Sequence, residues 1–248
     1  MSAVLPIYFE SGSTRVFAGA LDWPGWCRSG KSEAAAVDEL LAYRARYTTV
    51  LDEAAPPDLS PPLGRLTVDV RERLIGGSGT DFGAPAAPPT ADKEAIDDAE
   101  LARLLAILGA CWSELDRQAA AATGVELSSG PRGGGRDLAK ILAHVLEAEQ
   151  AYLAKLGSKP PKGDGSTAHV AAHRAAVRAA FMARAMDRPV PEPNLVRVFW
   201  TPRYFIRRAA WHVLDHAWEV EDRTAPDGSG GGACGLADQQ RFAGLEQR

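Results

Sequence analysis

Two histidines four residues apart, His212 and His216, stand in the segment RAAWHVLDHAW. Helical residues at this spacing lie on one face with Cβ atoms about 5–6 Å apart, and their imidazole nitrogens can bind one metal ion. The chain has five histidines, and another of them, His144, lies in the segment DLAKILAHVLEAE, which is also typical of a helix. This pattern predicts a three-histidine metal site between helices. The same spacing also fits hydrogen-bonded histidines at packing boundaries.

A second pair with identical spacing, His169 and His173, competes for the same role. Its helix is predicted to pack through Val170, Val177 and Phe181, a stripe from which His169 points away. We therefore expect His169 to be solvated and His173 to be peripheral, and we assign the metal to the other three histidines.

Three protein ligands leave one coordination position open, as in catalytic rather than structural zinc sites. A bound ion lowers the pKa of a thiol or water, and a neutral ligand set favours an anionic fourth ligand such as a thiolate. Glu219 lies one turn beyond His216 and is a candidate catalytic residue, either as a general base or as a partner of the ligand histidine. An exposed helix charge is the simpler interpretation.

A glycine-rich segment precedes the helix that carries His144. Backbone N–H groups of successive glycines and a helix N-terminus attract anions, and arginines add bidentate contacts. This predicts a site for an acidic group of a substrate or cofactor, formed by Arg132, Gly133, Gly134, Gly135 and Arg136. The alternative is a plain loop that ends at Asp137, the N-cap of the helix.

The elements that position these residues fall into an α+β arrangement. Residues 1–75 predict a small β-β-α-β module: two strands within 5–21, a turn at 22–25, a helix from the N-cap Ser32 to about Asp52, and a strand at 66–74. Residues 76–92, rich in Gly, Pro and Ala, predict a linker. Helices at about 93–122, 136–156, 166–187 and 201–222 predict an all-α four-helix bundle over 93–223, followed by a flexible tail at 224–248.

The bulk composition is that of a globular protein. Of the 248 residues, 46% are hydrophobic and 24% charged, and no stretch approaches the roughly 20 apolar residues of a membrane span. The net charge of −4 argues against a nucleic-acid partner, and three scattered cysteines fit a reducing compartment. We expect a cytoplasmic protein with no membrane partner.

The segments around His144 and around His212 and His216 resemble the DinB-like superfamily of four-helix bundles, over about residues 93–223. That pattern has one histidine on the second helix and H-x-x-x-H on the last. The resemblance implies a divalent ion, most often zinc or nickel, on the three histidines. It also implies a small-thiol cosubstrate, transferase or isomerase activity, and possible homodimers.

The N-terminal segment, with its DWPG turn at 22–25 and GKS step at 30–32, resembles the HicB-like fold. That family implies binding of a protein partner. Trp23 and Trp26 either form the wall of a pocket or anchor the contact with the bundle, and burial favours anchoring.

The sequence therefore leads to two hypotheses. The first is a metal-dependent transferase or isomerase that uses a small thiol and acts on a small acidic substrate. The second is a non-catalytic interaction protein, in which the HicB-like module binds a partner and the metal is structural or vestigial.

Overall fold

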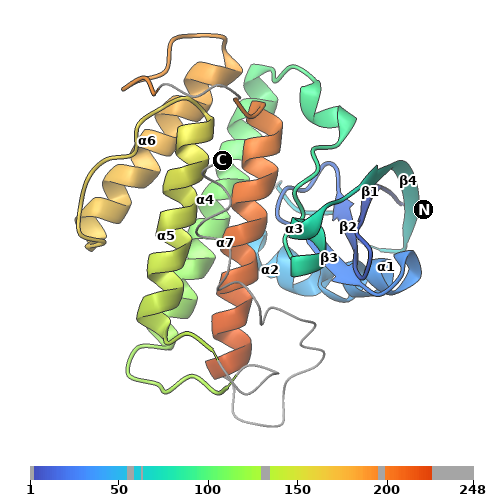
Figure 1. The fold of residues 1–248 in the computed structure, drawn as a ribbon. Helices are drawn as coiled ribbons and strands as arrows, with labels where there is room; N and C mark the ends of the chain where they lie inside the picture. The colour runs from blue at the N-terminus through green and yellow to red at the C-terminus, as the bar shows by residue number, and fades with distance from the viewer. Residues whose placement is uncertain (1–2, 55–58, 63, 130–134, 195–198, 225–248) are drawn as a thin grey trace.

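The computed structural model describes residues 3–54, 59–62, 64–129, 135–194 and 199–224 of a mixed α+β protein (Figure 1). A four-stranded sheet near the N-terminus has the order β3-β2-β1-β4. Its strands are β1 (Ala3–Ser11), β2 (Val16–Ala20), β3 (Cys27–Gly30) and β4 (Leu66–Ile75). Strand β1 pairs antiparallel with β2 and parallel with β4, so the chain crosses over between β3 and β4.

Two helices form this crossover. Helix α1 (Glu33–Ala42) begins where predicted, because the Ser32 side chain accepts a hydrogen bond from the Ala35 N–H. Tyr43 then separates α1 from α2 (Arg44–Ala54), so the predicted single helix is two. The prediction also missed β3, and the module is therefore β-β-β-α-α-β.

The predicted linker, 76–92, contains more structure than a spacer. It holds the short helix α3 (Ser78–Phe82) and the start of the 3-10 helix η1 (Thr90–Lys93). The buried Glu10 carboxylate on β1 accepts hydrogen bonds from the Thr80 hydroxyl and from the N–H groups of Ala86 and Ala87. These bonds hold the connection against the sheet.

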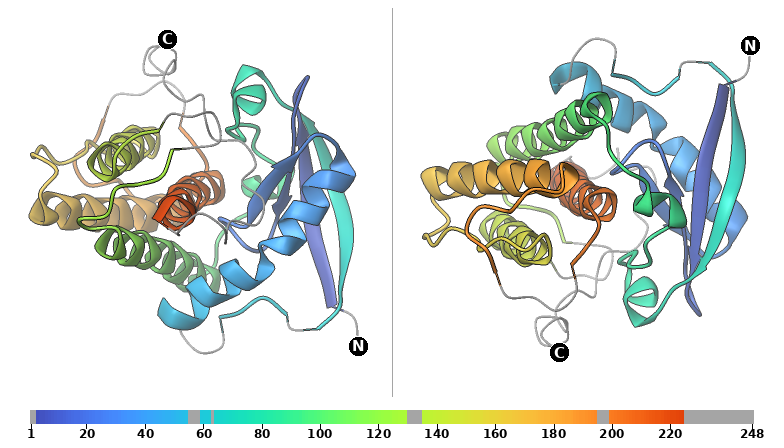
Figure 2. Two further views of the ribbon diagram at one scale, coloured as in Figure 1. Left: turned by 90° about the horizontal axis from the view of Figure 1, so that it is seen from below. Right: turned by 90° about the horizontal axis from the view of Figure 1, so that it is seen from above.

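Four long helices follow at nearly the predicted positions and lie side by side (Figures 1 and 2). They are α4 (Asp98–Ala121), α5 (Leu138–Lys155), α6 (Thr167–Ala185) and α7 (Pro202–Thr224). Helix α7 lies between the other three helices and the sheet (Figure 2) and is buried from Tyr204 to Trp218. One hydrophobic core therefore runs through both halves of the chain.

The turn between β2 and β3 packs directly on α7. Gly25 has φ +95°, and a Cβ there would lie 2.9 Å from Leu214 Cδ1 and 3.3 Å from Ala210 Cβ. Trp26 is fully buried, and its indole N–H donates to the Leu40 carbonyl. Trp26 is therefore buried, but its hydrogen bond and its stacking on Tyr47 lie within the N-terminal half and not at the predicted contact with the bundle. In the turn that touches α7, only glycine fits.

Two ion pairs, one buried and one partly buried, join the halves as well. The Arg207 guanidinium on α7 lies 2.7 Å from the Asp92 carboxylate of η1 and also donates to the Ala20 and Leu21 carbonyls. Arg28 of β3 lies 2.9 Å from Asp215 of α7. The position of α7, and of its histidines, is therefore fixed from the sheet side.

Of the predicted tail at 224–248, Thr224 is the last residue of α7, and 225–248 lie outside the described residues. Within the described ranges, no helix has both the length and the apolar character that crossing a bilayer requires.

Candidate metal centre

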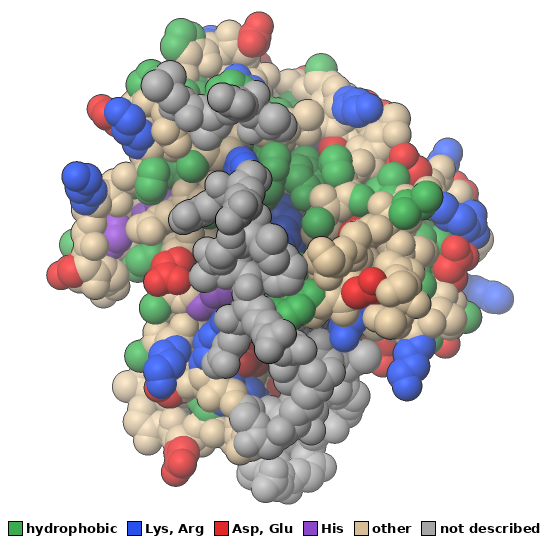
Figure 3. All heavy atoms as spheres, in the orientation of Figure 1, with side chains coloured by type: hydrophobic (Ala, Val, Ile, Leu, Met, Phe, Trp, Pro, Cys, Tyr) green, Lys and Arg blue, Asp and Glu red, His purple; other side chains and the backbone are tan. Residues whose placement is uncertain are grey.

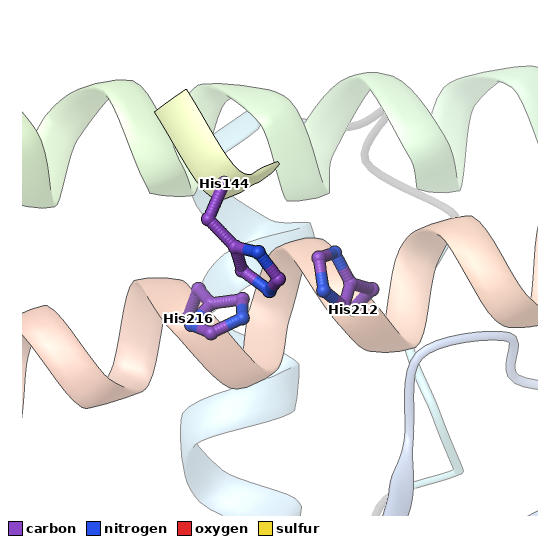
Figure 4. A group of neighbouring side chains, drawn as sticks. All are labelled: His144, His212 and His216. Atoms are coloured by element: carbon purple, nitrogen blue, oxygen red, sulfur yellow. The ribbon is translucent and has the colours of Figure 1, made fainter. Parts of the chain in front are cut away.

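Three histidines from two helices converge as the sequence predicts. His144 on α5 faces His212 and His216 on α7 (Figure 4). One ring nitrogen of each lies within 4.8 Å of the others. The ring centroids are 5.2 Å apart for His144 and His212, 5.0 Å for His144 and His216, and 4.7 Å for His212 and His216. Nitrogens of a tetrahedral zinc site lie about 3.4 Å apart, so small ring rotations suffice to bring the three onto one ion.

Two of these imidazoles are buried with unsatisfied nitrogens. His212 is 4% exposed and His216 is 1% exposed, whereas His144 is partly exposed. Among the described residues, neither Nδ1 of His212 nor Nε2 of His216 has a hydrogen-bond partner. A buried polar atom left in this way costs about 1–3 kcal/mol. The donor set therefore fits a divalent cation, which would use such lone pairs.

Glu219 fixes the orientation of one of the three candidate ligands, His216. Its Oε2 lies 2.8 Å from His216 Nδ1, and its Oε1 accepts from Arg223 Nη1 at 2.8 Å. Arg223 in turn donates through Nε to the Ser128 carbonyl at 2.9 Å. A carboxylate that supports a metal-binding histidine contacts the ring nitrogen that does not bind the metal, and Glu219 makes this contact with His216. The sequence analysis did not identify Arg223, although its i,i+4 spacing from Glu219 indicates an ion pair on one helix face.

The electrostatics of the site favour the neutral form of His212. Burial lowers the pKa of His212 well below its usual value, and the charges of His216, Arg208, His144 and Arg136 lower it further, in that order. His212 is therefore neutral at physiological pH, and neutral imidazole is the form that binds metals.

The glycine-rich segment is described only in part. Arg132, Gly133 and Gly134 lie outside the described residues. Gly135 lies against Arg223, since a Cβ at Gly135 would come within 2.5 Å of Arg223 Nη2. Arg136 is partly buried, and its charge acts on His212. Asp137 caps α5 by accepting from the Lys140 N–H, as predicted.

The expectation for the second histidine pair was wrong. His169 is buried, not solvated, because its Nδ1 accepts from the Gly165 N–H while its Nε2 lies 3.1 Å from the Pro161 carbonyl oxygen. His173 is fully buried, not peripheral, and burial lowers its pKa to about 4. Within the described part of the chain, the one group of potential metal ligands is His144, His212 and His216.

Comparisons with family models, with curated proteins and with solved structures found no match to this chain.

Proposed function

We propose that this protein is a metal-dependent enzyme, a transferase or isomerase that uses a small thiol. In this proposal, His144, His212 and His216 bind a divalent ion, zinc or nickel. The observation that carries the proposal is a pair of buried nitrogens, one on His212 and one on His216, that have no hydrogen-bond partner among the described residues and lie beside a third imidazole. Three neutral donors are the ligand set that leaves one position for another molecule.

The surroundings support a reactive site over a structural one. A structural zinc site is closed by four protein ligands, and only three candidates meet here among the described residues. His144 is partly exposed, and histidine side chains are visible at the surface in Figure 3. Solvent access on the His144 side therefore favours an enzyme over the interaction protein, whose metal would be enclosed.

The chain's own residues divide the remaining roles. When bound, the ion would lower the pKa of a thiol. Glu219 acts through His216: it holds the proton on Nδ1 and so keeps Nε2 as an electron-pair donor. Arg223 holds Glu219 in place from the other side. Arg136 would attract the acidic end of a long thiol, because its charge already acts on His212.

The arrangement of α4, α5, α6 and α7 supports a DinB-like bundle as the scaffold, since the second and last of these helices carry the histidines. In this proposal, the sheet and the Gly25 turn, which the HicB-like resemblance includes, have a structural role. They pack against α7 and fix its position.

A cobalt titration tests the proposal. Cobalt(II) replaces zinc in such sites and gives an intense near-ultraviolet band when a thiolate binds to it. The metal-free protein, loaded with one equivalent of cobalt and titrated with 2-mercaptoethanol, should develop this band at neutral pH. Tight cobalt binding without any thiol band would instead favour the interaction protein.

A further inference from the structure

The last turn of α7 contacts the connection between α4 and α5. The end of α7 and the start of α5 lie at the same end of the bundle (Figure 1). The Ser128 N–H donates to the Arg223 carbonyl oxygen at 2.9 Å, and Arg223 Nε donates back to the Ser128 carbonyl oxygen at 2.9 Å. A small apolar cluster joins Val220 of α7 to Leu127 and Leu138. These contacts hold the described part of the connection against α7.

The far end of the same connection lies on the Arg223 guanidinium. A Cβ at Gly135 would come within 2.5 Å of Arg223 Nη2 and 2.8 Å of Arg223 Cζ. Gly135 does not have a positive φ, so the arginine and not backbone strain excludes a larger residue there. Arg223 is only 9% exposed. The absence of a side chain at position 135 therefore leaves the space that the guanidinium occupies.

The Arg223 guanidinium also supports a candidate metal ligand. Its Nη1 donates to Glu219 Oε1 at 2.8 Å, and Glu219 Oε2 lies 2.8 Å from His216 Nδ1. The Glu219 and His216 side chains are 17% and 1% exposed, so these contacts are largely shielded from water. A continuous series of contacts therefore leads from Gly135 through Arg223 and Glu219 to the His216 ring.

We propose that Arg223 is a positioning residue that couples the connection before α5 to metal binding at His216. This inference rests on the proposed function and adds a means of regulating its site. When the connection moves away from α7, Arg223 loses its contacts with Ser128 and Gly135 and holds Glu219 less firmly. The His216 ring is then less well oriented for the metal. Coupling of this kind acts equally in both directions, so a bound ion also stabilises the connection.

The test is a double-mutant cycle on the full-length protein, with the zinc affinity measured by competition with a chromophoric chelator. Gly135→Ala places a methyl group on the guanidinium, and it should lower the zinc affinity about tenfold, as the loss of support for a ligand histidine does. Arg223→Lys keeps a charge beside Glu219 and removes the guanidinium, so the affinity should fall less than about threefold. In the Arg223→Lys background, Gly135→Ala should have no further effect.

Gly109→Ala is the matched control. A Cβ at Gly109 would also meet a guanidinium, 2.8 Å from Arg178 Nη2, but Arg178 is exposed and lies over Trp112 on another side of the bundle core. This variant should keep the zinc affinity of the wild type. The reverse effect is measured by hydrogen exchange. Saturating zinc should slow the exchange of the Ser128 N–H about fivefold in the wild type, and not in Arg223→Lys.

The outcomes separate this inference from the proposed function. Equal zinc affinity in the wild type and Gly135→Ala, or an equal loss from this change in both backgrounds, overturns the inference alone. Exchange of the Ser128 N–H that zinc does not slow in the wild type also overturns it. A wild type that binds neither zinc nor cobalt overturns the proposed function, and the inference falls with it.

Discussion

His216 Nδ1 lies 2.8 Å from Glu219 Oε2, one turn along α7. Burial raises the pKa of Glu219, but its hydrogen bonds and ion pairs with His216 and Arg223 lower it more, so the pKa is below its usual value. The carboxylate is therefore ionised and can only accept, and the proton resides on Nδ1. This tautomer presents the Nε2 lone pair, the atom that has no partner among the described residues.

Changes at Glu219 should therefore weaken metal binding without abolishing it. Glu219→Gln keeps an acceptor and loses the charge, and we expect the zinc affinity to fall about tenfold; Glu219→Leu should lower it up to about a hundredfold. Competition with a chromophoric chelator measures both. Glu221→Gln, on the same helix and paired with Arg46, is the matched control. Equal affinity in all three variants would show that Glu219 does not support the ligand.

Arg136→Ala should weaken the binding of a long acidic thiol. Glutathione, whose carboxylates lie far from its sulfur, is a suitable probe, and its affinity for the cobalt-loaded protein should fall about tenfold. Lys140→Ala removes an exposed cation from the first turn of α5, four residues after Arg136, and should have little effect. If Arg136→Ala leaves glutathione and every other acidic ligand unaffected, the anion site at the start of α5 is wrong.

His173 should make the metal-free protein less stable in acid. Its pKa is about 4 in the folded state, against an ordinary value of 6.5. Between these pH values His173 is protonated in the unfolded chain but not in the folded one. The contribution of neutral His173 to the free energy of unfolding is therefore fully present above pH 6.5 and is lost as the pH falls towards 4. The loss amounts to about 3 kcal/mol.

His173→Leu removes this loss, because leucine fills much of the same buried volume and does not titrate. Urea unfolding at pH 7 and at pH 4.5 gives the two free energies for each protein. The variant should lose less stability than the wild type between these pH values. Parallel losses would mean that His173 is protonated within the fold.

Asp92→Asn should destabilise the junction between η1 and α7. Asp92 and Arg207 are 1% and 8% exposed, and removal of one charge leaves the other buried without compensation. We expect a loss of about 3–5 kcal/mol in urea unfolding. Asp69→Asn, which breaks the exposed pair with Arg71, should cost less than about 1 kcal/mol. If both variants lowered the free energy of unfolding by a similar small amount, the Asp92–Arg207 pair would not contribute to the cooperative unfolding of the protein.

The long amphipathic helices could be predicted because the spacing of their apolar residues is a local property of the sequence. The i,i+4 histidines of α7 and the Ser32 cap are of this kind. Strand β3 could not be predicted, since Cys27–Gly30 has no apolar alternation and is held by backbone pairing with β2. The packing of residues 76–92 against the sheet could not be predicted either, because it depends on hydrogen bonds to Glu10, which is far away in the sequence.

The error at His169 has a similar cause. The apolar stripe of α6 was read correctly at Val177 and Phe181, which are buried. His169 is covered by the loop that precedes its own helix, through Pro161 and Gly165. Helical periodicity contains no information about a loop that folds back over the first turn.

Elemental analysis of the protein, purified without a histidine tag, tests the central claim most directly. The wild type should carry about one divalent ion per chain, and the double variant His212→Ala, His216→Ala should carry none. His169→Ala, which changes a histidine outside the site, should retain the ion. A stoichiometric ion in the double variant would contradict the assignment of His144, His212 and His216 as the ligands.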